Sequence, residues 1–203
     1  MNYEQAVAYI HGKYGKGVKR GLDNMYALLR RLGNPHEGLR CIHVAGTNGK
    51  GSTCAFLDAA LRAQGYRVGL YTSPFLMRYN ERMRINGCEI PDETLAALTT
   101  EVAAHVQAME ESGEGFPTVF EIGTAIVLTW LAREKVDVAV IEVGLGGTHD
   151  PTNVIHPEVS VIARIGLDHT RTLGSTLEEI AAVKRGNYAS AEQLAAGLAA
   201  NIR

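Results

Sequence analysis

Four short apolar runs alternate along the chain with helical patterns, and this alternation restricts the fold more than any other feature. The runs lie at 41–45, 67–71, 136–143 and 159–165. The last two are continuous and rich in β-branched residues, which is typical of parallel strands covered on both faces. Helical periodicity is found at 2–11, 23–33, 50–65, 91–112 and 118–135. The order predicts an α/β fold, a doubly wound and mainly parallel sheet with helices on both faces.

Composition excludes several classes of protein. Hydrophobic residues make up 46% of the 203 residues and charged residues 21%, as in a packed globular protein and unlike a disordered one. The formal net charge of −2 provides no field that would capture nucleic acid or an anionic membrane. The most apolar stretch, 122–132, falls short of the roughly 20 residues that span a bilayer, and no signal sequence is recognised. We therefore expect a cytoplasmic protein that binds neither nucleic acid nor membrane, with reduced cysteines because none forms a CxxC pair.

A glycine-rich segment follows the first apolar run and leads directly into a helix. It reads Gly46-Thr47-Asn48-Gly49-Lys50-Gly51-Ser52-Thr53. Glycines let backbone N–H groups close around phosphate oxygens, and a helix N-terminus adds a favourable dipole. Lys50 offers a positive charge, and Ser52 or Thr53 offers a hydroxyl to a metal ion. The spacing is a variant of the usual phosphate loop because Gly51 follows the lysine. A plain strand-to-helix turn is the alternative, but the pattern favours phosphate binding.

Polar residues also follow the other three predicted strands. They are Thr72-Ser73, Glu142 and Gly166-Leu167-Asp168-His169. Ligands of open parallel sheets lie outside the carboxyl ends of the strands. A carboxylate in the position of Glu142 suits Mg²⁺, although it could instead cap a neighbouring backbone group. Ser73 before a proline indicates only a turn by itself, and a single histidine such as His169 is more often structural than a ligand.

The segment 75–84 follows the second predicted strand and has a mixed composition. Three arginines alternate there with the apolar side chains of Phe75, Tyr79 and Met83. This mixture favours a mobile basic loop over a core element.

Together these residues resemble a known family, the ATP-dependent amide-forming ligases of the Mur type, and within it the folylpolyglutamate and dihydrofolate synthases. Residues 43–52 are similar to its phosphate loop, 72–74 with 80–82 to its substrate loop, 120–121 to its pterin-site helix, and 142–147 to its metal strand. Further similar segments lie at 21–23, 150–154, 166–169 and 173–177. The resemblance covers roughly residues 3 to 186.

The resemblance implies a role for each matching residue. For Mg²⁺ it implies Ser73, Glu142 and His169. For the ATP phosphates it implies Thr47, Asn48, Gly49, Lys50, Gly51, Ser52 and Thr53. For the substrate it implies Asp23, Phe120, Glu121 and Asp150. Lys184 matches a lysine that the family carboxylates with CO₂, so that the implied catalytic set is Lys50, Glu142, His169 and Lys184.

The activity implied by the resemblance is ligation of L-glutamate to a folate or dihydropteroate carboxylate. ATP, the co-substrate, converts this carboxylate to an acyl phosphate, which the glutamate amine then attacks, with Mg²⁺ as the cofactor. The partners are therefore ATP, dihydropteroate or reduced folate, and L-glutamate. The alternative is a nucleotide- or folate-binding remnant without turnover. A small P-loop kinase fits less well, because no arginine-rich lid is recognisable.

The resemblance also implies a domain organisation. Residues 1–187 correspond to an incomplete ATP-binding domain, 188–203 form an alanine-rich segment without a counterpart, and the C-terminal domain that brings glutamate is absent. A shortened sheet would expose an unpaired edge, so we expect possible self-association. Two segments depart from the family pattern. Thr148-His149 replaces an arginine, and 183–187 keeps only half of the pattern Glu-Lys-Ala-Gly-Ile.

Overall fold

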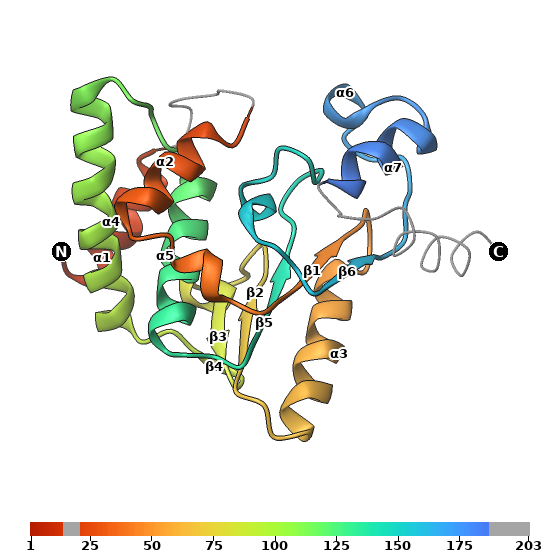
Figure 1. The fold of residues 1–203 in the computed structure, drawn as a ribbon, viewed down its shortest axis with the longest axis horizontal. Coiled ribbons are helices and arrows are strands. Elements are labelled where there is room, and N and C mark those ends of the chain that lie inside the picture. Colours follow the sequence, from red (N-terminus) through yellow and green to blue (C-terminus); the bar gives the residue numbers. More distant parts are fainter. Residues whose placement is uncertain (14–20, 187–203) are drawn as a thin grey trace.

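The computed structural model, drawn in Figure 1, describes residues 1–13 and 21–186. The alanine-rich segment 188–203 lies outside the described residues. Six strands form one sheet in the order β4-β3-β2-β5-β1-β6. Their bounds are Cys41–Ala45 (β1), Val68–Tyr71 (β2), Met83–Ile85 (β3), Cys88–Glu89 (β4), Val138–Glu142 (β5) and Val159–Ile162 (β6). Strands β2, β5, β1 and β6 are parallel and β3 and β4 antiparallel, which confirms the mainly parallel sheet.

The five helices predicted from periodicity begin and end close to the predicted positions, and the described residues after 169 form two helices for which no bounds were predicted. The α-helices are Tyr3–His11 (α1), Asp23–Arg31 (α2), Lys50–Ala63 (α3), Asp92–Ser112 (α4), Val119–Arg133 (α5), Thr170–Leu173 (α6) and Leu177–Arg185 (α7). Short 3-10 turns are formed by Pro35–Gly38 (η1), Tyr79–Arg82 (η2) and Pro151–Val154 (η3). None of the helices in the described ranges is both long and apolar enough to cross a membrane.

Helices cover both faces of the sheet, as predicted. Alternate side chains of β5 point to opposite faces, as the pleat of a strand requires. Val138 and Val140 pack with Cys54 of α3 in one cluster, while Ala139 and Ile141 belong to the larger cluster under α5. In Figure 1, α3 lies apart from α1, α2, α4 and α5, which gather on the other side.

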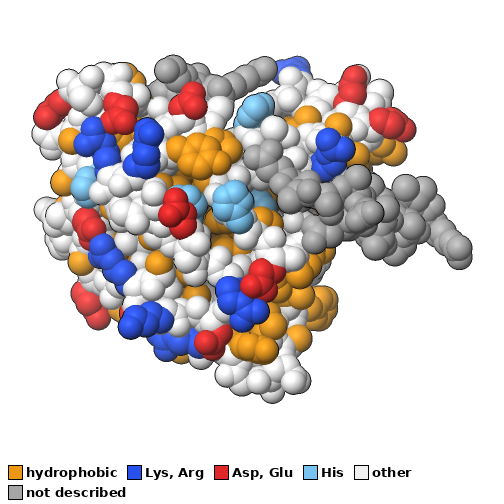
Figure 2. All heavy atoms as spheres, viewed as in Figure 1, with side chains coloured by type: hydrophobic (Ala, Val, Ile, Leu, Met, Phe, Trp, Pro, Cys, Tyr) orange, Lys and Arg blue, Asp and Glu red, His pale blue; other side chains and the backbone are white. Residues whose placement is uncertain are grey.

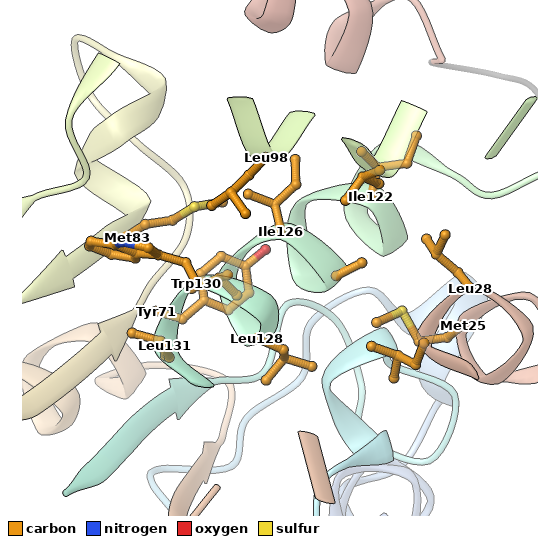
Figure 3. Packing of buried hydrophobic residues seen from close by; sticks show 14 of the residues in the cluster. Met25, Leu28, Tyr71, Met83, Leu98, Ile122, Ile126, Leu128, Trp130 and Leu131 are labelled. Atoms are coloured by element: carbon orange, nitrogen blue, oxygen red, sulfur yellow. The ribbon is translucent and has the colours of Figure 1, made fainter. Parts of the chain in front are cut away.

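Helix α5 forms the centre of the larger core. Its side chains are buried almost all round, because α4, α2 and α1 pack on it and because Phe120 and Leu131 of this helix lie against Tyr71 and Gly69 of β2. Figure 3 shows Ile126 and Leu128 of this helix between Leu98 of α4 and Met25 of α2. The continuous apolar face of the sequence is therefore explained by contact on several sides.

The prediction of a mobile basic loop at 75–84 is wrong for its second half. Tyr79 and Met83 are buried in the core, and Met83 begins β3, which pairs with β2. The first half is tied to the second, because the Glu81 carboxylate accepts hydrogen bonds from the backbone N–H groups of residues 76, 77 and 78 at 2.7–2.8 Å. Met83 and Ile85 face inward while Arg82 and Arg84 alternate with them. The arginines concealed this alternation of a half-buried strand.

The surface carries both signs of charge. On the face drawn in Figure 2, Lys and Arg side chains lie among Asp and Glu side chains.

Cys41 and Cys54 are buried and Cys88 is exposed, and all three are free thiols. Burial raises the pKa of the Cys41 and Cys54 thiols to about 12, which makes them poor nucleophiles.

Candidate nucleotide and substrate site

The glycine-rich segment forms a tight turn between β1 and α3. Gly46 has a φ of 146°, and a Cβ atom there would lie 2.9 Å from the Cβ of Ala163. Gly49 precedes α3 with a φ of 82°, and no side chain caps this helix start. The first N–H groups of a helix have no partner within the helix, so an uncapped start is suited to an anion. The local geometry is that of a phosphate loop.

The loop is fixed to the segment that follows β6. The Thr47 backbone N–H donates to the Arg164 carbonyl at 2.8 Å. The Thr47 hydroxyl lies 3.0 Å from both the N–H and the carbonyl of Gly166. The first and fourth strand exits are thus joined, and the Thr47 side chain is used for this junction.

Two lysines flank the loop. Lys50 begins α3, and its Nζ lies 3.5 Å from the Thr47 carbonyl oxygen. Lys184, near the end of α7, is only 4% exposed and donates to the Gly46 carbonyl at 2.9 Å. Burial lowers the Lys184 pKa, and the charge of Lys50 lowers it further. The two ammonium groups therefore lie at the same loop, and their combined positive charge favours binding of an anion there.

Glu142 and Ser73 meet at the ends of β5 and β2. Glu142 is 4% exposed, and its Oε2 accepts the Ser73 backbone N–H at 2.9 Å. Burial raises the pKa of Glu142, against the Ser73 N–H and the charges of Lys50 and Arg82, which lower it. The carboxylate thus both caps a backbone group and lies within the field of the loop lysine.

The residues present fit Mg²⁺ in part. This ion prefers oxygen ligands and retains several waters, so one carboxylate and one hydroxyl can suffice. Glu142 and Ser73 carry these groups, and the Ser73 backbone N–H donates to the Glu142 carboxylate. Within the described ranges there is no cluster of three or more His, Cys, Asp or Glu side chains that could hold a metal ion. His169 is exposed at the start of α6 with its Nε2 3.6 Å from Asp168 Oδ2, and its role as a ligand stays a prediction.

A cleft of about 920 Å³ lies beside these strand ends. Four of the predicted residues, Ser73, Phe120, Glu121 and Asp150, line it. Asp23 is not in the lining, although the neighbouring Gly21 is; Asp23 is an exposed residue in the first turn of α2. Arg82, Leu145 and His149 also line the cleft. The sequence placed Arg82 in the segment similar to the substrate loop, Leu145 in the segment similar to the metal strand and His149 at a departure from the family pattern, but it assigned none of them an individual role.

Phe120 provides an apolar wall of the cleft. Its ring stacks on Tyr71 with the centroids 6.0 Å apart and an interplanar angle of 25°. Gly144 allows the ring to approach the loop, because a Cβ atom there would lie 2.5 Å from Phe120 Cζ. A flat apolar surface of this kind can accept an aromatic ring.

Glu121 has a structural task besides lining the cleft. Its carboxylate accepts the Thr118 N–H at 2.6 Å, and the Thr118 hydroxyl accepts the Glu121 N–H, which completes a capping box. Burial raises the pKa of this carboxyl group. The structure therefore explains Glu121 as a helix cap, and its contact with a substrate stays a prediction.

Thr148, which stands where the resemblance has an arginine, closes the end of α7. Its backbone N–H and hydroxyl both donate to the Val183 carbonyl, at 3.0 and 3.1 Å. The preceding Gly147 lies against the same turn of α7. The loop after β5 and the helix that carries Lys184 are thus in direct contact.

Replacing Gly147 with alanine should destabilise the protein by about 1–3 kcal/mol. A Cβ atom at this position would lie 2.6 Å from the Val183 carbonyl oxygen and 2.8 Å from that of Lys184, and backbone atoms cannot move aside cheaply. Urea unfolding will measure the loss. Gly38→Ala is the matched control, since a Cβ atom there meets nothing within 4 Å. Equal stability of the two variants would contradict the packing described.

The free energy of unfolding should fall in acid, because the folded protein holds His43 as a neutral, buried imidazole. The imidazole is 1% exposed, and burial lowers its pKa to about 4. Between about pH 6.5 and 4 the unfolded chain therefore binds a proton that the folded chain does not, so stability falls as the pH falls. Wild type should lose about 3 kcal/mol relative to His43→Gln across this window. Urea unfolding of both proteins at pH 7.5 and pH 4 measures the difference. A constant difference would show that His43 titrates normally.

Comparisons with known proteins agree with this geometry. The Mur ligase middle domain model matches residues 44–190. The chain is 48% identical over 185 residues to the dihydrofolate synthase/folylpolyglutamate synthase of Bacillus subtilis strain 168, covering 91% of this chain and 43% of that protein.

Solved structures give the same result. A folylpolyglutamate synthase in complex with AMPPCP and folate superposes with a TM-score of 0.90 at 41% identity, over 98% of this chain and 51% of that one. The FolC protein of Escherichia coli in complex with DHPP and ADP has a TM-score of 0.82 at 37% identity, over 92% of this chain and 44% of that one. The chain therefore spans about half the length of these relatives.

Proposed function

The chain belongs to the Mur ligase middle domain family, and from this premise we propose that it forms the nucleotide-binding part of an ATP-dependent amide-forming ligase that joins L-glutamate to folate or dihydropteroate. Three relatives support this proposal: a curated folylpolyglutamate/dihydrofolate synthase, a folylpolyglutamate synthase solved with AMPPCP and folate, and a structure solved with DHPP and ADP.

One observation carries the proposal. Lys50, Glu142 and Lys184 come from three distant parts of the chain and meet at the phosphate loop: the charge of Lys50 acts on both of the others, and Lys184 donates to the Gly46 carbonyl, beside a cleft with an aromatic wall. Such a site can hold a triphosphate next to an aromatic substrate. A carboxylate is a poor electrophile. Attack of its oxygen on the γ-phosphorus of ATP releases ADP and gives an acyl phosphate, and the glutamate amine then attacks the acyl carbon and displaces phosphate.

Each residue has a defined task in this chemistry. The backbone N–H groups of the loop and Lys50 hold the ATP phosphates and disperse the charge that develops on them. Ser73 and Glu142 would hold Mg²⁺, which supplies charge neutralisation between phosphate oxygens. Phe120 orients the pterin ring. A carboxylated Lys184, which the resemblance implies, would add a negative group beside Gly46, and its buried position and lowered pKa support a reactive free amine.

The proposal is tested by a single incubation with three readouts. The purified chain is mixed with Mg-ATP, dihydropteroate or tetrahydrofolate, and radiolabelled L-glutamate. Phosphate release together with labelled amide product is the expected result for the ligase. Binding of nucleotide and pterin substrate without product would identify the alternative, a remnant without turnover. Absence of nucleotide binding would overturn both. The preferred pterin substrate is the one with the higher kcat/KM.

Self-association is proposed from the edge of the sheet. Strand β6 is the last strand, and its Val159 side chain is 50% exposed. An uncovered edge of this kind can pair with another chain. Light scattering across a range of protein concentrations should show a mass that rises with concentration. A cytoplasmic location stays a separate proposal from the amino-acid sequence.

A further inference from the structure

A buried chain of hydrogen bonds connects the strand that carries the phosphate loop to the cleft. His43 lies on β1, three residues before Gly46, and its Nε2 is 2.8 Å from the Thr152 hydroxyl. The Thr152 hydroxyl is also hydrogen-bonded to Asp150 Oδ1. His43, Thr152 and Asp150 are 1%, 0% and 3% exposed. This series of hydrogen bonds joins residues that are more than 100 positions apart in sequence.

The direction of each hydrogen bond follows from the number of protons. Asp150 accepts the backbone N–H of Leu145 at 2.8 Å and that of Thr152 at 3.0 Å, and the Gly144 N–H also donates to it. Three such donors require an acceptor, so the Thr152 hydroxyl donates its single proton to this carboxylate. The hydroxyl oxygen must then accept from His43, which places the imidazole proton on Nε2.

We propose that His43 is a positioning residue for Asp150 and acts through the Thr152 hydroxyl. Asp150 in turn holds the backbone of Gly144 and Leu145, and all three line the cleft. The position of this wall is therefore set from β1, the strand that ends in the phosphate loop. The proposal rests on the function proposed above in one respect, because it assigns the wall to the pterin substrate and the loop to the nucleotide.

The arrangement differs from simple filling of the core. An apolar side chain of similar size at position 152 would pack equally well but could not transmit the hydrogen bond. Loss of the hydroxyl leaves a buried imidazole N–H and a carboxylate oxygen each without one partner, and buried groups in that state are costly. The carboxylate is then free to turn, and the Gly144–Leu145 backbone loses its fixed acceptor.

Two pairs of variants test the proposal. Thr152→Val removes the hydroxyl and keeps the shape, while Thr152→Ser keeps the hydroxyl. His43→Leu removes the donor, while His43→Gln keeps an N–H near the position of Nε2. The first readout is amide hydrogen exchange of Leu145 by NMR, which needs no ligand. Exchange should be at least about tenfold faster in Thr152→Val and His43→Leu and close to wild type in Thr152→Ser and His43→Gln. The Val140 amide in β5 serves as the internal control.

The second readout separates positioning from general loss of stability. The Kd for tetrahydrofolate should rise about tenfold in Thr152→Val, while the Kd for AMPPCP changes less than about twofold. The double variant His43→Leu/Thr152→Val should raise the Kd for tetrahydrofolate no more than the more damaging single variant does, because both substitutions interrupt the same series of hydrogen bonds.

Two results would overturn the proposal. One is unchanged Leu145 exchange in Thr152→Val, and the other is an additive effect of the two substitutions. An equal rise in both dissociation constants would indicate a structural role only and would also reject it. If wild type binds no pterin substrate, the proposed function fails, while the exchange measurement still decides whether His43 positions Asp150.

Discussion

Replacing Lys50 with alanine is expected to weaken binding of AMPPCP in the presence of Mg²⁺ by about 100-fold. The Lys50 ammonium group lies at the start of α3, beside the loop whose N–H groups are suited to phosphate oxygens. A hydrogen bond to a charged group contributes about 1.5–3 kcal/mol, and 1.4 kcal/mol corresponds to a factor of ten in affinity. Isothermal titration calorimetry measures the change directly.

The same substitution should leave the fold intact. Lys50 makes one long contact, to the Thr47 carbonyl, and alanine is the better helix former. We expect the free energy of unfolding to change by less than about 0.5 kcal/mol. Arg133→Ala is the control, since it also removes a positive charge but lies at the far end of α5 in an exposed pair with Glu101. Unchanged nucleotide affinity, or a large fall in Tm without ligand, would reject the assigned role of Lys50.

Glu142→Gln should abolish the effect of Mg²⁺ on nucleotide affinity. In wild type we expect Mg²⁺ to strengthen AMPPCP binding at least about tenfold, because the Glu142 carboxylate would help to hold an ion that neutralises phosphate charge. Glutamine has almost the same shape, and its carbonyl oxygen can still accept the Ser73 N–H that Glu142 accepts in the structure. Titrations with Mg²⁺ and with EDTA, on both proteins, give the four dissociation constants that are needed.

The stability of this variant provides a second test. Burial raises the pKa of Glu142, so the folded protein holds the proton more tightly than the unfolded chain does. The group therefore favours the folded state below its unfolded pKa, and this contribution is lost as the pH rises through the folded pKa. Glu142→Gln should accordingly be at least as stable as wild type at pH 7.5 and should lose this advantage in acid. Glu93→Gln, on the exposed first turn of α4, is the control.

In the Mg²⁺ titrations, an effect of Mg²⁺ on nucleotide affinity that persists in Glu142→Gln would show that the ion is held elsewhere.

Local patterns were sufficient for most of the sheet. The buried strands β1 and β5 were predicted because they are covered on both faces, so that nearly every residue is apolar. The segment 75–84 failed for the opposite reason. In β3, the second strand from the edge of the sheet, Met83 and Ile85 are buried, and Arg82 and Arg84 alternate with them in sequence.

The site shows the same division between local and long-range information. The conformation of the phosphate loop follows from its own glycines, and the sequence therefore identified it. The sequence did not distinguish Asp150 from the exposed Asp23, although the structure places only Asp150 in the cleft lining. It gave no reason to connect His43 with Thr152.

The amino-acid sequence by itself determined the strand and helix pattern, the phosphate loop and the polar residues at the strand ends, because these depend on neighbours within a few positions. The tertiary structure alone decided that Lys184 reaches the Gly46 carbonyl, that the Glu142 carboxylate accepts the Ser73 backbone N–H, and which carboxylates line the cleft. These contacts join segments separated by about 70 to 140 residues, and they form only when the crossover connections bring the carboxyl ends of the parallel strands to one edge of the sheet.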